Sequence, residues 1–200
     1  MAVVFGCIAP VQAESMVILV LGDSISSGHG IVPESRWSTL LDQRLKKMGY
    51  NYEVANASIS GDTTSGGLNR ISGLLTRHQP AILLLELGGN DGLRGMAPTA
   101  IRNNLSAIIE KAQAANVKTL LLGMRIPPNY GTRYSAAFEK LYYQLALQYK
   151  APLVPFLLQG VAAQPAMMQS DGIHPSARAQ LRILENIWTH LMPLLKQPAN

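Results

Sequence analysis

Apolar, strand-like segments alternate with amphipathic, helix-like segments along the chain, and this alternation limits the possible folds more than any other feature. The clearest strand is AILLLELG at 81–88, and the other expected strands are 16–22, 52–58, 117–124 and 152–156. Between and after them, apolar residues at helical spacing predict helices over 37–49, 63–78, 98–116, about 133–149 and about 175–195. This order predicts an α/β fold: a three-layer α/β/α sandwich with a five-stranded parallel sheet.

The expected last helix has an apolar face that we predict packs onto the sheet. Residues on this face recur at steps of three and four: Ala177, Leu181, Leu184, Trp188, Leu191 and Leu195. The chain shows no internal repeat, low-complexity tract or linker. We therefore expect residues 14–200 to form a single domain.

The composition is that of a globular protein, with 48% hydrophobic and 14% charged residues and a net charge of +5. The basic residues are scattered, and the longest cluster is Lys46-Lys47 beside Arg44. Because no stripe of basic and aromatic residues occurs, we expect no nucleic-acid partner. The positive charge is compatible with, at most, weak association with an anionic membrane surface. Nothing in the sequence requires more than a monomer.

The first thirteen residues, MAVVFGCIAPVQA, predict a signal peptide because they are short, apolar and end in small residues. Cleavage after Ala13 would give a periplasmic or secreted protein that begins at Glu14. No Lys or Arg precedes the apolar stretch, so a frayed apolar terminus is the alternative. Cys7 is the sole cysteine and lies within this segment, where lipid attachment is a further alternative. Without it, the mature chain cannot use disulfides or a catalytic thiolate.

Several expected strands end in loops of unusual composition, which should gather at one edge of a parallel sheet. They are GDSISSG at 22–28, SISGDT at 58–63, LGGNDGLRG at 87–95 and MRIPPNYG at 124–131; the chain after the last strand leads into SDGIHPS at 170–176. The first loop lacks the lysine of a phosphate-binding loop and does not match a dinucleotide fingerprint. The four histidines are dispersed. We therefore expect neither a cofactor nor a metal.

These loops carry the residue types that acyl transfer requires. Ser24 lies at a strand-to-helix bend, where its hydroxyl can serve as a nucleophile. Asp171 lies three residues before His174, so its carboxylate can accept the imidazole N–H and orient the base. The alternative interpretation of Ser24 and Asp171 is an ordinary turn or helix cap. Ser26 occupies the last position of G-x-S-x-G, which excludes an ordinary nucleophile elbow.

Two further residues could stabilise an oxyanion. Gly61 offers a backbone N–H that substrate can approach closely, and Asn90 offers a neutral side-chain amide. Each, taken alone, is also typical of a turn after a strand.

Taken together, GDS, SGDT, GGND and DGIHP resemble, in order, the four blocks of the SGNH (GDSL-type) hydrolases. NASISGDT, ELGGNDGLRG and MQSDGIHP are similar to the group of periplasmic acyl-CoA thioesterase I, lysophospholipase and arylesterase enzymes. The resemblance implies a flavodoxin-like fold without metal or cofactor. It implies Ser24 as nucleophile, His174 as base and Asp171 as its partner, with an oxyanion hole of the Ser24 and Gly61 N–H groups and Asn90. It also implies that the loop 92–97 moves with a bound acyl chain.

The expected function is therefore hydrolysis of small acyl esters and thioesters, namely aryl esters, acyl-CoA and lysophospholipids, by a serine hydrolase. An apolar segment at 156–168 could line an acyl groove together with the loop 126–131, or it could simply cap the core. The candidate substrate-binding residues are Gly92, Leu93, Met96, Pro127, Tyr130 and Phe156. The alternatives are a carbohydrate acetyl esterase of the same fold, which would have a polar pocket, and a non-catalytic periplasmic binding protein.

Overall fold

The computed structural model describes residues 15–162 and 164–198. The predicted signal peptide, its cleavage site after Ala13 and Cys7 lie outside these residues. The described chain forms a five-stranded, entirely parallel sheet in the order β2-β1-β3-β4-β5. Its strands are β1 Met16–Gly22, β2 Tyr52–Asn56, β3 Ile82–Glu86, β4 Lys118–Leu122 and β5 Leu153–Val154.

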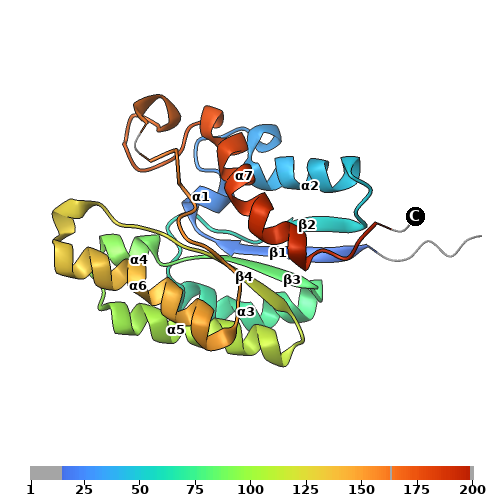
Figure 1. Cartoon of the computed structure of the whole chain (residues 1–200), viewed down its shortest axis with the longest axis horizontal. Coiled ribbons are helices and arrows are strands. Elements are labelled where there is room, and N and C mark those ends of the chain that lie inside the picture. Colours follow the sequence, from blue (N-terminus) through green and yellow to red (C-terminus); the bar gives the residue numbers. More distant parts are fainter. Residues whose placement is uncertain (1–14, 163, 199–200) are drawn as a thin grey trace, which may run out of the picture.

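The helices cover both faces of this sheet, as Figure 1 shows. On one face, α3 (Thr64–His78), α5 (Pro98–Ala114) and α6 (Thr132–Tyr149) pack side by side; on the other, α2 (Trp37–Lys47) packs against α7 (Gln180–Leu191). Pro98 stands at the start of α5, where its missing N–H costs no hydrogen bond. The three-layer α/β/α prediction is confirmed.

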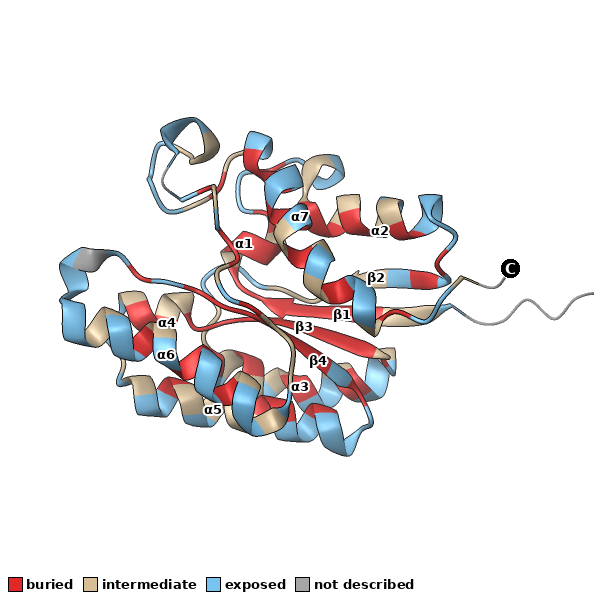
Figure 2. Ribbon diagram, viewed as in Figure 1, coloured by how far each residue is buried: buried red, intermediate tan, exposed pale blue. Residues whose placement is uncertain are grey.

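The strands are buried because helices cover the sheet on both sides (Figure 2). All five residues of β3 are buried, as are the last five of β1. The continuous apolar runs follow from this, since neither face of a central strand meets water. Burial also extends to Glu86, the last residue of β3, whose side chain is fully enclosed.

The last helix differs from the prediction in its extent and in its buried face. The segment is divided into a 3-10 turn at Ala177–Ala179, the helix α7 and a second 3-10 turn at Met192–Leu194. Leu181 is 56% exposed and Ala177 is also exposed, whereas Ile183 and Ile187 are fully buried. The predicted face was therefore wrong at its N-terminal end. Ala177 precedes the α-helix, so its spacing to Leu181 carries no information about the helix face.

Two very short helices follow strands where only loops were expected. They are α1 at Ser24–Ser27, directly after β1, and α4 at Gly89–Leu93, after β3. Helices of one turn are too short to produce a hydrophobic period, so the sequence could not reveal them. Within the described residues, no helix is both long and apolar enough to cross a membrane.

The topology places three loops together. Strand β1 lies between β2 and β3, with Val20 opposite Asn56 and Gly22 opposite Glu86. The loops that leave these three strands therefore start next to one another at the carboxyl edge of the sheet. The chain after β5 starts at the far edge of the sheet and returns to α1 before α7 begins, as Figure 1 shows.

Candidate active site

Ser24 is presented by a tight turn between β1 and α1. The side chain of Asp23 caps α1, because its Oδ1 accepts a hydrogen bond from the Ile25 N–H at 3.0 Å. Gly22 is required here, since a Cβ at this position would lie 2.6 Å from Glu86 Oε2 and 2.7 Å from Ser26 Cβ. The turn thus holds Ser24 as the first residue of α1.

The structure brings Ser24, His174 and Asp171 into one chain of hydrogen bonds. His174 Nε2 lies 2.9 Å from Ser24 Oγ, and His174 Nδ1 lies 2.7 Å from Asp171 Oδ2. The other carboxylate oxygen of Asp171 accepts the backbone N–H groups of Ile173 at 2.8 Å and His174 at 2.9 Å. The hydrogen bonds from the His174 backbone and ring, together with that from Ile173, hold the pKa of Asp171 well below its ordinary value.

The loop that carries His174 is fixed by backbone contacts on both sides. Gln169 N–H donates to the His174 carbonyl at 2.8 Å, and Ser176 N–H donates to the Met167 carbonyl at 2.7 Å. The ring of His29 packs against the His174 ring, with 4.4 Å between centroids. The sequence does not reveal this contact, because His29 and His174 are far apart in the chain.

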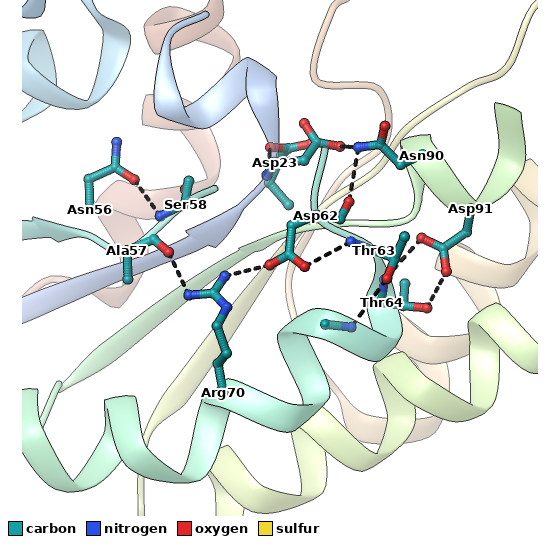
Figure 3. A network of polar contacts seen from close by, with 12 residues as sticks. Asp23, Asn56, Ala57, Ser58, Asp62, Thr63, Thr64, Arg70, Asn90 and Asp91 are labelled. Atoms are coloured by element: carbon teal, nitrogen blue, oxygen red, sulfur yellow. Dashed lines mark hydrogen bonds and ion pairs between the residues drawn. The ribbon is translucent and has the colours of Figure 1, made fainter. Parts of the chain in front are cut away.

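Asn90 lies in α4 with its side chain directed at the loop from β2. Its Nδ2 donates to the Asp62 carbonyl at 2.9 Å and to Asp23 Oδ2 at 3.1 Å (Figure 3). Gly61 precedes Asp62 and has a φ of 79°, a conformation that favours glycine. A Cβ on Gly61 would meet nothing within 4 Å, so this position faces open space. The Asn90 amide therefore links the residue after Gly61 to the residue before Ser24.

Asp91, the neighbour of Asn90, joins α4 to the start of α3. It is fully buried, and its carboxylate accepts the Thr64 N–H at 2.9 Å and the Thr64 hydroxyl at 2.5 Å (Figure 3). A carboxylate at the first turn of a helix satisfies free N–H groups and complements the helix dipole. The loops that carry Gly61 and Asn90 are thus tied together on both sides.

Two buried carboxyl groups lie beneath Ser24, and sequence reasoning missed both. Asp23 is 2% exposed, and Glu86 Oε2 accepts the Asp23 N–H at 3.1 Å and the Ser26 hydroxyl at 2.8 Å. Burial raises the pKa of Asp23 to about 6. Burial and the nearby charge of Asp23 raise the pKa of Glu86 well above its ordinary value. For Glu86, the sequence offers one signal: it is a single glutamate at the end of the apolar run of β3.

The predicted substrate-binding residues divide into two groups. Tyr130 Oη donates to the Leu93 carbonyl at 2.9 Å, and Tyr134 Oη donates to the Met96 carbonyl at 2.6 Å. Gly92 is buried, and a Cβ there would lie 2.7 Å from both Ile126 and Phe138. The segment after Asn90 therefore rests on α6 and on the loop after β4, which also contains Pro127, an exposed residue.

Phe156 lies elsewhere. It is half-buried beneath the guanidinium of Arg125, which lies 4.9 Å from the ring centroid. It lines a depression of about 470 Å³ between β5 and α7, which includes Arg182 and His190 but none of the Ser24, Asp171 and His174 side chains. None of the contacts described for Phe156 joins it to Leu93 or Tyr130, so the structure does not bring these predicted residues together.

Metal ligands are not gathered in the part of the chain that the structure describes: it contains no cluster of three or more His, Cys, Asp and Glu side chains arranged to hold an ion. The residues at the site are instead a hydroxyl, an imidazole, a carboxylate and amide donors. This set is suited to nucleophilic attack on a carbonyl and to stabilisation of the resulting oxyanion.

Comparison with known proteins identifies the family to which the chain belongs. Residues 20–182 match the model of the GDSL-like Lipase/Acylhydrolase family. The chain belongs to this family. The family predicted from the four sequence blocks is therefore confirmed, and the match includes Ser24, Gly61, Asn90, Asp171 and His174.

Individual members of this family are similar over almost their whole length. Esterase TesA of Pseudomonas aeruginosa is 52% identical over 194 residues, which cover 95% of this chain and 96% of the relative. Thioesterase 1/protease 1/lysophospholipase L1 of Escherichia coli K12 is 43% identical over 92% of this chain and 86% of the relative. A crystal structure of TesA has a TM-score of 0.88 at 53% identity, covering 90% of this chain and all of that one.

Proposed function

We propose that this chain is a serine esterase and thioesterase that hydrolyses acyl substrates through an acyl-enzyme on Ser24. The observation that carries this proposal is the hydrogen-bonded chain from Ser24 Oγ through the His174 ring to Asp171 Oδ2. Membership of the lipase/acylhydrolase family supports the same chemistry. The names of three relatives, Esterase TesA, the Arylesterase of Vibrio mimicus and Thioesterase 1/protease 1/lysophospholipase L1, support aryl esters, thioesters such as acyl-CoA, and lysophospholipids as substrates.

In the proposed reaction, Ser24 Oγ attacks the carbonyl carbon while His174 Nε2 accepts the hydroxyl proton. The ionised carboxylate of Asp171 accepts the Nδ1–H, so it fixes the tautomer and stabilises the imidazolium. The carbon–oxygen or carbon–sulfur bond to the leaving group then breaks, and His174 gives its proton to the leaving alcohol or thiol. A water molecule attacks the acyl-enzyme by the same steps and releases the carboxylic acid.

The tetrahedral oxyanion would be held by the Ser24 and Gly61 N–H groups and by the Asn90 amide. Asn90 Nδ2 carries two hydrogens, and in the structure both are donated, to Asp62 and to Asp23. The bond to Asp23 is the longer of the two. We infer that this bond is exchanged for the oxyanion while the bond to Asp62 persists and keeps the amide in place.

The acyl chain is proposed to lie along the segment that follows Asn90. Leu93, Met96 and Tyr130 provide apolar surface there, and methionine adapts to acyl chains of different shape. The hydroxyl of Tyr130 is held by the Leu93 carbonyl, which links the two sides of this surface.

Covalent labelling combined with a substrate series tests the proposal. A fluorophosphonate probe should label the wild-type chain at Ser24, should not label Ser24→Ala, and should label the control Ser72→Ala, which changes an exposed serine on α3. In a series of p-nitrophenyl esters, the enzyme should hydrolyse esters with acyl chains longer than acetyl. Failure of the probe to label Ser24 would exclude a catalytic serine. Activity limited to acetyl esters would favour a carbohydrate acetyl esterase.

Export and domain organisation remain part of the proposal. The apolar segment 1–13, with its small residues before Glu14, supports a periplasmic enzyme that consists of one domain over 14–200. N-terminal sequencing of the protein recovered from a periplasmic fraction should begin at Glu14. An uncleaved N-terminus in the cytoplasmic fraction would contradict this.

A further inference from the structure

The loop from β2 to α3 carries Gly61, and backbone contacts join only its first part to β1. Ala57 N–H donates to the Val20 carbonyl and Ile59 N–H donates to the Gly22 carbonyl, so these residues continue the pairing with β1. Beyond them, Asp62 N–H donates to the Ile59 carbonyl at 3.1 Å, which closes a turn within the loop itself, and the Ser60 hydroxyl contacts the exposed Ser27 hydroxyl at 2.9 Å. Side chains therefore hold this turn against the rest of the molecule.

Arg70 of α3 supplies these contacts at both ends of the loop (Figure 3). Its Nη1 donates to the Ala57 carbonyl at 2.9 Å, and its Nη2 donates to Asp62 Oδ2 at 2.5 Å. The side chains of Arg70 and Asp62 are only 26% and 10% exposed. A guanidinium presents several donors in one rigid plane, so a single side chain can bridge two acceptors that a lysine could not hold together.

Asp62 transmits this contact to Asn90. Its carbonyl accepts one hydrogen of the Asn90 amide at 2.9 Å, and Asp62 directly follows Gly61 in the chain, so its position also fixes that of Gly61. The Asp62 carboxylate also lies directly over α3, because a Cβ on Gly66 would come within 1.9 Å of Asp62 Oδ1. Arg70 and Gly66 thus define where Asp62 lies, from two sides.

Resting on the function proposed above, we propose that Arg70 is a positioning residue for the oxyanion hole, acting through Asp62 on the Gly61 N–H and the Asn90 amide. Arg70 touches neither Ser24 nor His174 through any hydrogen bond described for it. It should therefore affect the stabilisation of the transition state and leave substrate binding in the ground state almost unchanged.

Two variants on different residues test this inference. Arg70→Gln removes the bridge, and Gly66→Ala displaces Asp62 without changing any charge. Each has a matched control on the same helix: Arg77→Gln changes an exposed arginine, and Gly73→Ala adds a methyl group that meets nothing within 4 Å. Arg70→Lys keeps the charge but loses the bridge, so it separates charge from geometry.

We expect kcat for a p-nitrophenyl ester to fall roughly 10- to 100-fold in Arg70→Gln and Gly66→Ala. When the oxyanion-hole donors are displaced, the loss of rate should be similar to that caused by a misplaced substrate. KM should stay within about threefold of wild type, and the rate of labelling by the fluorophosphonate should fall in parallel with kcat. Arg70→Lys should lose most of the same activity. Both controls should match wild type.

The inference is overturned if kcat stays within about twofold of wild type in both test variants, or if KM rises while kcat is unchanged. Circular dichroism and thermal unfolding show whether each variant is folded at the assay temperature. Should Arg70→Gln fail to fold, Gly66→Ala decides, since alanine favours helix more than glycine does. A wild-type chain that neither hydrolyses esters nor reacts with the probe would refute the proposed function. If the wild type is active and both test variants are equally active, only the role of Arg70 is refuted.

Discussion

His174 Nε2 lies 2.9 Å from Ser24 Oγ, although 150 positions separate the two residues in the chain. Ser24 follows the interior strand β1, whereas His174 lies in a loop that starts after β5, at the far edge of the sheet. Their contact therefore depends on the return of the segment after β5 across the carboxyl edge. The first prediction concerns this pair.

Removing either member of the pair should nearly abolish turnover. We expect Ser24→Ala and His174→Ala to lower kcat on a p-nitrophenyl ester by roughly 10⁴ to 10⁶, because catalytic groups that act as a unit are lost together. His190→Gln, in α7, is the matched control and should retain full activity. A near-normal rate in Ser24→Ala would show that Ser24 is not the nucleophile, and one in His174→Ala would show that His174 is not the base.

Asn90→Ala should lower kcat by about 10² to 10³ with little change in KM, as is typical when one oxyanion donor is removed. The substitution also leaves the Asp62 carbonyl and Asp23 Oδ2 without the amide that they bind. Steady-state kinetics beside a thermal unfolding curve separates the two effects. A KM effect with unchanged kcat would place Asn90 in substrate binding and outside the oxyanion hole.

A bulky residue at position 96 should change which acyl chains are accepted. The Met96 side chain is half-buried, while its backbone carbonyl is held by Tyr134, so Met96→Trp alters the surface without releasing the backbone. We expect hydrolysis of long-chain p-nitrophenyl esters to fall relative to that of the acetyl ester. An unchanged ranking across the series would show that acyl chains do not reach Met96.

Glu86→Gln should change how stability depends on pH. Because the pKa of Glu86 is raised in the folded state, the folded protein keeps a proton that the unfolded chain releases above its ordinary value of 4.5. The free energy of unfolding of the wild type therefore falls as pH rises through this window, by up to about 1.4 kcal/mol per pH unit. Glutamine keeps an acceptor for Asp23 N–H and the Ser26 hydroxyl but does not titrate.

Chemical denaturation at pH 5, 6, 7 and 8 measures this effect. The stability of Glu86→Gln relative to wild type should increase as the pH rises above 4.5, until Glu86 ionises in the folded wild type. In the wild type, Asp23, whose pKa burial raises to about 6, contributes a slope of the same sign from its ordinary 3.8 up to about pH 6. Parallel stability curves for the two proteins would mean that Glu86 does not hold a proton in the folded state.

Much of this molecule could be predicted from its sequence, for physical reasons that differ between elements. The apolar runs at β1 and β3 predicted buried parallel strands, and the known geometry of such sheets then placed Ser24, Gly61 and Asn90 at one edge. The pairing of Asp171 with His174 could also be predicted, because a carboxylate and an imidazole three residues apart can meet within one turn.

Other features could not be predicted because they depend on the three-dimensional path of the chain. Nothing near Arg70 indicates that its guanidinium bridges Ala57 and Asp62, since the bridge requires the turn of the chain into α3. The predicted face of the last helix assumed a helix from about residue 175, whereas α7 starts at Gln180 after a 3-10 turn and buries Ile183 while Leu181 stays exposed.

The return of the His174 loop has a consequence for how the enzyme matures. During synthesis, the hydroxyl of Ser24 and the amide of Asn90 leave the ribosome well before the imidazole. Gln180, at the start of α7, accepts the Trp37 N–H at the start of α2, and His174 lies shortly before Gln180 in the chain, so we expect docking of the C-terminal helix to bring the base into place. We therefore expect esterase turnover to start only when the last segment has docked, so the appearance of activity reports the final step of folding.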